Sequence, residues 1–301
     1  MKVPKRLQPM VDDGLVDEVV SQLMGGKEAS VYVVRVGHEF LCAKVYKEAD
    51  QRSFKHAAQY QEGRGGRNSR RNRAIEKGSK YGRAEQEEAW QTAEVDALYR
   101  LANAGVRVPE PVACVHGVLL MELITDHEGY AAPRLNDVTF SRKQALEDHS
   151  FLMHNVMRML CAGLVHGDLS EFNVLLDAKG PVIIDLPQAV DAAANNQSRT
   201  MLVRDINNIT NYYARFAPEL RSTRYAQEIW GLYEKGELQA ETILTGKWKS
   251  AKKVANVKGV LREIHDAKKE EEHRQARNNP ETHGTTTPVK RSRGGNRRHR
   301  R

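Results

Sequence analysis

The sequence predicts an α+β chain of two lobes: a small lobe built on a β-sheet with one main helix, and a larger lobe made mostly of helices. Two observations support this prediction. Apolar, β-prone runs surround one long stretch of helical spacing in the first part of the chain, and helical stretches dominate after about residue 123. With 301 residues, of which 40% are hydrophobic, the chain can form one two-lobed unit with extensions.

The small lobe is expected over residues 25–122, after an N-terminal extension at residues 1–24. One helix is expected at residues 85–104, because Gly105 and Pro109 supply the stop signals that end a helix. Four strands are expected around it, near residues 31–37, 40–46, 111–115 and 117–121.

Two glycines, Gly25 and Gly26, precede the strand expected at residues 31–37. Backbone amides beside glycine can approach phosphate oxygens closely, so this turn is a candidate phosphate-binding loop. It is not a Walker A loop, because Lys27 is followed by Glu28 where that motif requires Ser or Thr. Alone, such a pattern is more often an ordinary hairpin turn, and its interpretation depends on a lysine that follows.

That lysine is Lys44, which lies inside the apolar run from Leu41 to Tyr46. A charged side chain is unfavourable in such a strand unless it has a partner, and strand lysines of this kind hold the phosphates of ATP. The candidate ion-pair partner is Glu94, in the helix expected at residues 85–104. An exposed helix glutamate would fit the same pattern, so both interpretations of Glu94 stay open.

The stretch from Leu164 to Asp185 carries the chemistry. Asp168 and Asn173 lie five positions apart, and Asp185 follows Asp168 by seventeen. Transfer of a γ-phosphoryl group needs one carboxylate to orient and deprotonate the attacking hydroxyl, and two oxygen ligands to hold Mg²⁺ against the phosphates. Asp168 can supply the first function, and Asn173 and Asp185 the second. The spacing therefore predicts phosphoryl transfer.

The large lobe is expected over residues 123–248. Its expected elements are helices near residues 141–163 and 200–216, a strand pair at 174–177 and 182–185, and one or two further helices within 219–248.

Four ordered motifs resemble those of the RIO-type atypical serine/threonine protein kinases, and their first subfamily most. These motifs are Gly26–Tyr32, Ala43–Lys47, His166–Asn173 and Ile184–Val190. The resemblance implies a reduced protein-kinase fold that binds ATP with Mg²⁺ or Mn²⁺ and lacks the activation segment and peptide-docking helices of ordinary kinases. The chain agrees, since Leu186 and Pro187 follow Asp185 where ordinary kinases have Phe and Gly.

Carried over by position, the resemblance implies that Asp168 and Asp185 are catalytic, and that Asn173 and Asp185 bind the metal. Met121 would be the gatekeeper, and the residues after it the hinge whose backbone reads adenine. Because the family can phosphorylate its metal-binding aspartate, a phosphoaspartate at Asp185 and ATP hydrolysis are also implied. The implied nucleotide-binding residues are Gly26, Lys27, Ser30, Lys44, Glu94, Met121, Glu122, Leu123 and Ile124.

The formal net charge of +8 is unevenly distributed. A glycine- and arginine-rich run falls within a flexible loop expected at residues 61–84, and Ser69 in it is an autophosphorylation candidate. The C-terminal extension, residues 249–301, is polar to basic and is expected to be disordered after about residue 279. The loop and the tail predict binding to RNA or a ribosomal particle, with a solubilising role as the alternative for the tail.

Three functions remain open. The first is a RIO-type kinase or ATPase that phosphorylates itself or a protein substrate. The second is a small-molecule phosphotransferase of the aminoglycoside or choline type, which shares the spacing around Asp168 but usually carries a later Gly-Asp-Pro element that this chain lacks. The third is an RNA-binding nucleotide switch. Three widely spaced cysteines and the lack of an evident signal peptide or membrane span predict a cytoplasmic protein with no membrane partner.

Overall fold

The computed structural model describes residues 2–26, 29–47 and 80–248, without the side chains of residues 80–91. Lys27, Ser69, residues 61–79 of the expected basic loop and the whole C-terminal extension therefore lie outside the described residues. Within the described part, no helix combines the length and apolar character that crossing a membrane requires.

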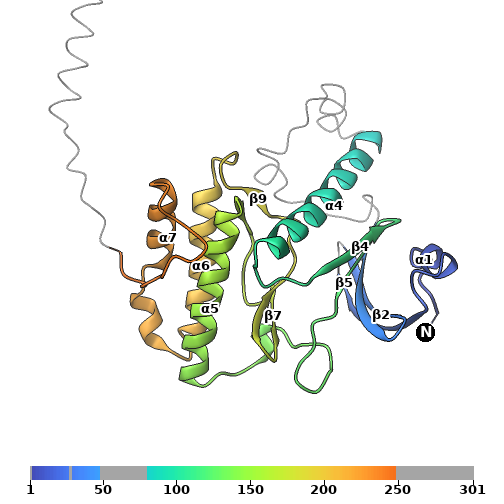
Figure 1. Ribbon diagram of the computed structural model, residues 1–301, viewed down its shortest axis with the longest axis horizontal. Coiled ribbons are helices and arrows are strands. Elements are labelled where there is room, and N and C mark those ends of the chain that lie inside the picture. Colours follow the sequence, from blue (N-terminus) through green and yellow to red (C-terminus); the bar gives the residue numbers. More distant parts are fainter. Residues whose placement is uncertain (1, 27–28, 48–79, 249–301) are drawn as a thin grey trace, which may run out of the picture. The chain divides into compact units, whose positions relative to one another are not determined.

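A five-stranded antiparallel sheet, in the order β1-β2-β3-β5-β4, forms the small lobe. All four expected strands are present, together with one that the sequence did not predict. The strands are β1 (Glu18–Gly25), β2 (Ala29–Val36), β3 (Glu39–Tyr46), β4 (Pro111–Val115) and β5 (Val118–Glu122). Figure 1 shows this sheet on one side of α4 (Lys80–Asn103) and the helices of the large lobe on the other.

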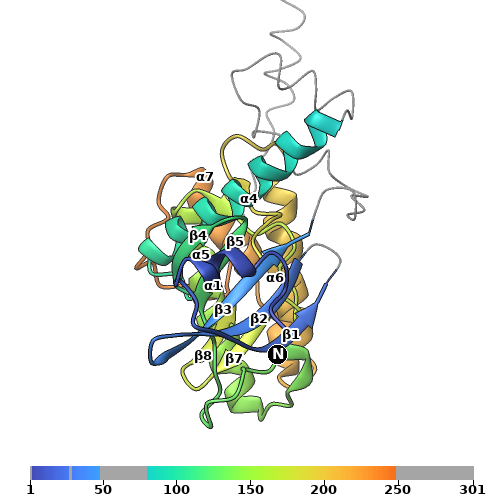
Figure 2. The ribbon, with the colours of Figure 1, turned by 90° about the vertical axis from the view of Figure 1, so that its right-hand side faces the viewer.

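The prediction that residues 1–24 are an extension is wrong. β1 forms one edge of the sheet, and helix α1 (Gln8–Asp12) lies against the sheet's outer face, in front of the strands in Figure 2. Leu7 and Met10 are fully buried there, in a cluster with residues of β2, β3 and β5. The sequence did not reveal β1 because only Val19 in it is buried, so the strand lacks the alternation that marks a half-buried strand.

Helix α4 begins at Lys80, five residues before the expected start, so residues 80–84 are helical and do not belong to a loop. Its C-terminal half carries Leu98 and Leu101 into the core. Gly105 follows the helix with φ of +70°, a left-handed conformation that glycine adopts readily at a helix end. The helix connects β3 to β4 and places one face of its last turns toward the sheet.

The large lobe contains three packed helices and two short strand pairs. The helices are α5 (Arg142–Cys161), α6 (Ser198–Tyr213) and α7 (Tyr225–Glu234), with 3₁₀ turns η2 (Leu135–Asp137) and η3 (Pro218–Ser222). The strand pairs are β6 (Leu164–Val165) with β9 (Val190–Asp191), and β7 (Val174–Asp177) with β8 (Gly180–Ile183). β8 ends two residues earlier than expected, so Ile184 and Asp185 lie beyond the strand.

The burial of Met10 generates a stability prediction. Met10→Ala should lower the free energy of unfolding by about 2–5 kcal/mol, because it removes a fully buried side chain from the outer face of the sheet. Leu15→Ala, at a neighbouring position that is 41% exposed, is the matched control and should cost less than about 1 kcal/mol. Denaturant unfolding measures both. Equal losses for the two variants would show that the N-terminal segment is not part of the folded core.

Candidate functional site

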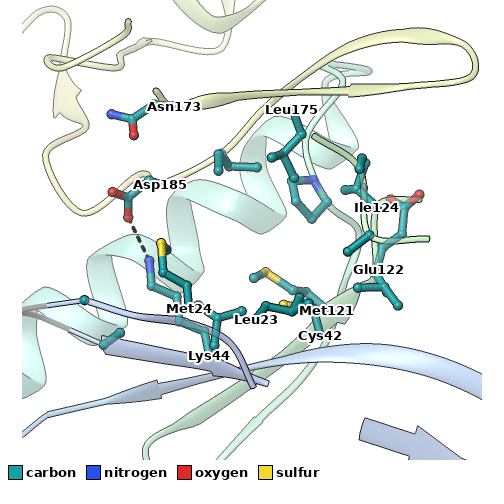
Figure 3. Close-up of a pocket in the computed structure, with 18 of the residues that line it drawn as sticks. Leu23, Met24, Cys42, Lys44, Met121, Glu122, Ile124, Asn173, Leu175 and Asp185 are labelled. Atoms are coloured by element: carbon teal, nitrogen blue, oxygen red, sulfur yellow. Dashed lines mark hydrogen bonds and ion pairs between the residues drawn. The ribbon is translucent and has the colours of Figure 1, made fainter. Parts of the chain in front are cut away.

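A cavity of about 510 Å³ lies between the sheet and the large lobe, and Figure 3 shows most of the residues that line it. β1, β2 and β3 form one wall, the segment after β5 closes one end, and residues around β7 and beyond β8 form the opposite wall. Nine of the residues that the sequence assigned to nucleotide or metal binding line it: Gly26, Lys44, Glu94, Met121, Glu122, Leu123, Ile124, Asn173 and Asp185.

Two predicted residues do not line the cavity. Ser30 lies between Ala29 and Val31, which do line it, and successive side chains of a strand point to opposite faces. Ser30 therefore faces away from Lys44. Asp168 also lies outside the lining, although its backbone is bonded to Asn173, which belongs to it.

Lys44 joins three elements in the lining of the cavity. Its Nζ lies 2.5 Å from Oε1 of Glu94 on α4 and 2.9 Å from Oδ1 of Asp185, the pair drawn in Figure 3. Tyr46 donates a hydrogen bond from its hydroxyl to the other Glu94 oxygen, at 2.8 Å. The ion pair expected between Lys44 and Glu94 is present, and the alternative of an exposed glutamate is wrong because the Glu94 side chain is only 5% exposed.

The charges of this cluster stabilise one another. Burial alone would lower the pKa of Lys44, but Glu94 and Asp185 together outweigh it and hold that pKa well above its ordinary value. The nearby Lys44 ammonium lowers the pKa of Asp185, against the effect of burial. Lys44 is therefore a fixed cation, and Asp185 is a fixed anion whose side chain remains 47% exposed to the cavity.

Asp185 has φ of +68°, in the left-handed region that non-glycine residues seldom adopt. The residue on either side explains how this conformation is held. The Ile184 N–H donates to the Asn173 carbonyl at 3.0 Å, and Leu186 is buried. Strained backbone of this kind is typical of functional positions, where the surrounding structure fixes a side chain in one direction. Here the direction is toward Lys44.

The loop from His166 to Asn173 is braced by its own side chains. His166 is buried and donates from Nε2 to the Ile184 carbonyl at 3.1 Å, while its Nδ1 accepts the Asp168 N–H at 3.3 Å. Burial lowers the pKa of His166, which agrees with this neutral tautomer. Asn173 donates to the Asp168 backbone carbonyl at 2.9 Å. His166 thus ties the Asp168 loop to the segment that carries Asp185.

Helix α6 holds the loop from His166 to Asn173 by hydrogen bonds to its backbone, through residues to which the sequence assigned no role. The buried Asp205 carboxylate accepts the backbone N–H groups of Gly167 at 2.8 Å and Leu169 at 3.2 Å. Arg204 donates to the Gly167 carbonyl, and Asn208 donates to the Leu169 carbonyl at 3.1 Å. The available signal was the position of Asp205, three residues after Leu202 and four before Ile209, which places it on the apolar face of a predicted helix, where a buried carboxylate requires partners.

The Asp168 carboxylate is oriented by Gln188, whose Nε2 lies 3.3 Å from Oδ2. Partial burial raises the pKa of Asp168 above its ordinary value, against the opposing effects of His166 and Arg204. A carboxylate with a raised pKa accepts a proton more readily, which suits a residue that takes the proton of an attacking hydroxyl.

Arg107 connects the last residue of β5, Glu122, to the large lobe, and the sequence did not predict this role. Its guanidinium bonds both carboxylate oxygens of Glu122, at 2.8 and 3.0 Å, and Oδ2 of Asp177 at 2.6 Å. Its backbone N–H donates to Oδ1 of Asn155 on α5, at 2.7 Å. Through Arg107, the Glu122 side chain therefore fixes the first residue of the expected hinge to Asp177 at the end of β7.

The oxygen donors of the site suit a cation of the Mg²⁺ type. Asn173 and Asp185 both line the cavity. The Asn173 amide nitrogen donates to the Asp168 carbonyl, so the side-chain oxygen of Asn173 is the atom that can coordinate a metal ion. Among the described residues, no group of three or more His, Cys, Asp or Glu side chains could hold a metal ion. Mg²⁺ in nucleotide sites is commonly held by one or two protein oxygens together with phosphates, and this pair fits that pattern.

Comparison with known proteins identifies the family. A family model described as the RIO domain matches residues 30–226. The RIO-type serine/threonine-protein kinase Rio1 of Haloferax volcanii is 34% identical over 208 residues, which cover 68% of this chain and 67% of that protein. The serine/threonine-protein kinase rio1 of Schizosaccharomyces pombe is 31% identical over 216 residues, which cover 69% of this chain but only 41% of that longer protein.

The fold agrees with a solved structure. The Rio2 kinase from Chaetomium thermophilum matches with a TM-score of 0.51 and 21% sequence identity, over 74% of this chain and 66% of that one. The predicted class, an α+β reduced two-lobed kinase-like fold, is therefore confirmed.

The buried Asp205 generates a pH prediction. Burial raises the pKa of this carboxyl from 3.8 to about 7. Between these values the folded protein keeps a proton that the unfolded chain has released, so the contribution of Asp205 to stability falls as pH rises from about 4 to about 7. Asp205→Asn should remove this component. The unfolding free energy of the wild type minus that of the variant should therefore decrease across the window.

Denaturant unfolding at several pH values measures this difference. Asp96→Asn, at an exposed position on α4, is the control for the loss of a carboxylate elsewhere in the chain. An Asp205→Asn difference that stays constant with pH would contradict the assignment of a raised pKa to Asp205.

Proposed function

This chain belongs to the RIO family of atypical serine/threonine protein kinases, and we propose that it transfers the γ-phosphoryl group of ATP to a hydroxyl of a protein substrate or of itself. The observation that carries the proposal is Lys44, which is held between Glu94 and Asp185 inside a cavity of about 510 Å³. A buried lysine with two carboxylate partners, in a cavity that an asparagine also lines, matches the requirements of phosphoryl transfer.

Each residue has a distinct part in this proposal. Lys44 binds the α- and β-phosphates, because its ammonium points into the cavity and Glu94 fixes its direction. Asp168 orients the attacking hydroxyl and accepts its proton, while His166 and Asp205 hold the loop in place. Asn173 and Asp185 would hold Mg²⁺, which when bound neutralises charge on the phosphates. The hinge segment, Glu122 to Ile124, would contact adenine at the closed end of the cavity.

We also propose a covalent intermediate, in which Asp185 itself becomes phosphorylated. Its carboxylate is anionic, half exposed and directed into the cavity, as a nucleophile toward a phosphoryl group must be. Attack of a carboxylate oxygen on the γ-phosphorus would break the bond to the β–γ bridging oxygen and release ADP. Water would then hydrolyse the acyl phosphate, release inorganic phosphate and regenerate the carboxylate. On this route the protein would act as an ATPase.

Association with RNA or with ribosome maturation is a separate part of the proposal. It rests on the basic composition of residues 61–84 and 249–301, most of which lie outside the described residues. The family assignment favours a protein substrate over the small molecules of aminoglycoside- or choline-type phosphotransferases.

Labelling with γ-labelled ATP and Mg²⁺ tests the central proposal. Lys44→Ala and Asp185→Asn should each reduce phosphoryl transfer by about 100-fold or more, because each removes a charge that the transferring group requires. Lys143→Ala, an exposed lysine on α5, should leave transfer unchanged. Full transfer by either cleft variant would overturn the role assigned to that residue.

A loss of fold must be separated from a loss of chemistry. Lys44→Ala leaves Glu94 buried without its cation, which is destabilising in itself. The double variant Lys44→Ala/Glu94→Gln removes the stranded charge, and it should melt closer to wild type while staying inactive.

The chemistry of the label distinguishes the two forms of the proposal. Label that survives hydroxylamine is phosphoserine or phosphothreonine and supports a kinase that phosphorylates itself. Label that hydroxylamine releases, and that Asp185→Asn lacks, is an acyl phosphate and supports the ATPase route.

A further inference from the structure

The cavity holds a second cation, Arg134, whose charge is not balanced in the way that of Lys44 is. Lys44 has two carboxylate partners. Within the described residues, the Arg134 guanidinium has no carboxylate within ion-pair distance, and the polar atom that it contacts is the sulfur of Met24. A thioether is a weak acceptor, so this contact satisfies little of what a guanidinium can donate.

The backbone of Arg134 is fixed to β7 and η2 of the large lobe. Arg134 forms an isolated β-bridge with Leu175, and the preceding Pro133 carbonyl accepts the Leu176 N–H at 2.9 Å. Its own carbonyl accepts the Asp137 N–H at 2.9 Å, at the start of η2, and the next residue, Leu135, is fully buried. A fixed backbone places the long side chain in a limited volume above β7.

The guanidinium extends from β7 in the large lobe toward β1 in the sheet. Met24, which it contacts, lies in β1 immediately before Gly25 and Gly26, and Figure 3 draws Met24 on the wall from which Lys44 reaches Asp185. Met24 and Arg134 both line the cavity. The guanidinium therefore extends from the large lobe to the end of β1, beside the glycine turn.

We propose that Arg134 is a second phosphate-binding residue, which exchanges the Met24 sulfur for phosphate oxygens of the bound nucleotide and contacts them from the large-lobe side. The inference rests on the proposed function, since it requires that the cavity bind ATP. A guanidinium offers paired donors that match two phosphate oxygens, and charge-assisted bonds of this kind are stronger than a bond to sulfur. Lys44 and Arg134 would then hold the polyphosphate between the two lobes.

Binding measurements with ATP and adenosine separate phosphate contacts from adenine contacts. By isothermal titration calorimetry, Arg134→Gln should weaken ATP binding about tenfold or more and change adenosine binding less than about twofold. Arg134→Lys keeps the charge but loses the paired donors, so its ATP affinity should fall between wild type and Arg134→Gln. Arg199→Gln, which removes an exposed arginine paired with Glu234 on α7, is the matched control and should bind both ligands as wild type does.

The outcomes distinguish this inference from the function on which it depends. If the wild type binds ATP and Arg134→Gln binds it equally well, the role of Arg134 is refuted and the proposed function stands. Equal weakening of ATP and adenosine would also refute the role, because Arg134 would then shape the cavity without contacting phosphate. If the wild type binds adenosine no more weakly than ATP, both the inference and the proposed function fail.

Discussion

The site depends on one buried ammonium group. The Lys44 side chain is only 12% exposed, and burying its charge is unfavourable unless carboxylates lie close by. Glu94 supplies one from α4 and Asp185 supplies the other from the large lobe. To pair with both carboxylates, the Lys44 Nζ requires α4 to lie against the sheet and the segment after β8 to approach the sheet. A change in either packing would leave a charge unpaired, so the cavity and the fold are specified together.

The large lobe fixes its side of the cleft in a different way, through hydrogen bonds to backbone. His166 bonds the segment that carries Asp185, Asp205 accepts two N–H groups of the Asp168 loop, and Arg107 joins Glu122 to Asp177. None of these side chains needs to touch a substrate. Their effect is to hold Asp168, Asn173 and the hinge at fixed positions, which a reaction that depends on the placement of phosphate and hydroxyl requires. Arg134 differs from them, because its guanidinium faces the cavity with a weak partner.

The sequence predicted the elements whose signals are local. Short stretches of sequence contain the signals for the strand around Lys44, for the helix that carries Glu94, and for the spacing of Asp168, Asn173 and Asp185. The ion pair expected between Lys44 and Glu94 is present. It did not predict β1, because an edge strand with a single buried residue has no period-2 pattern. The contacts of Arg107 and Asp205 join residues 15 to 70 positions apart, and no short window contains both partners. Ser30 was misplaced because a motif gives the position of a residue but not the face of the strand it occupies.

Asp185 and Asn173 are proposed to hold a divalent cation against the phosphates that Lys44 is proposed to bind. The most direct test is the dissociation constant of ATP with and without Mg²⁺, for the wild type and for Asp185→Asn. Mg²⁺ should tighten ATP binding by about tenfold or more in the wild type, and this gain should be largely lost in Asp185→Asn, which keeps the shape of the side chain but loses its charge. A gain from Mg²⁺ that is equally large in both proteins would contradict the assignment of this carboxylate to the metal.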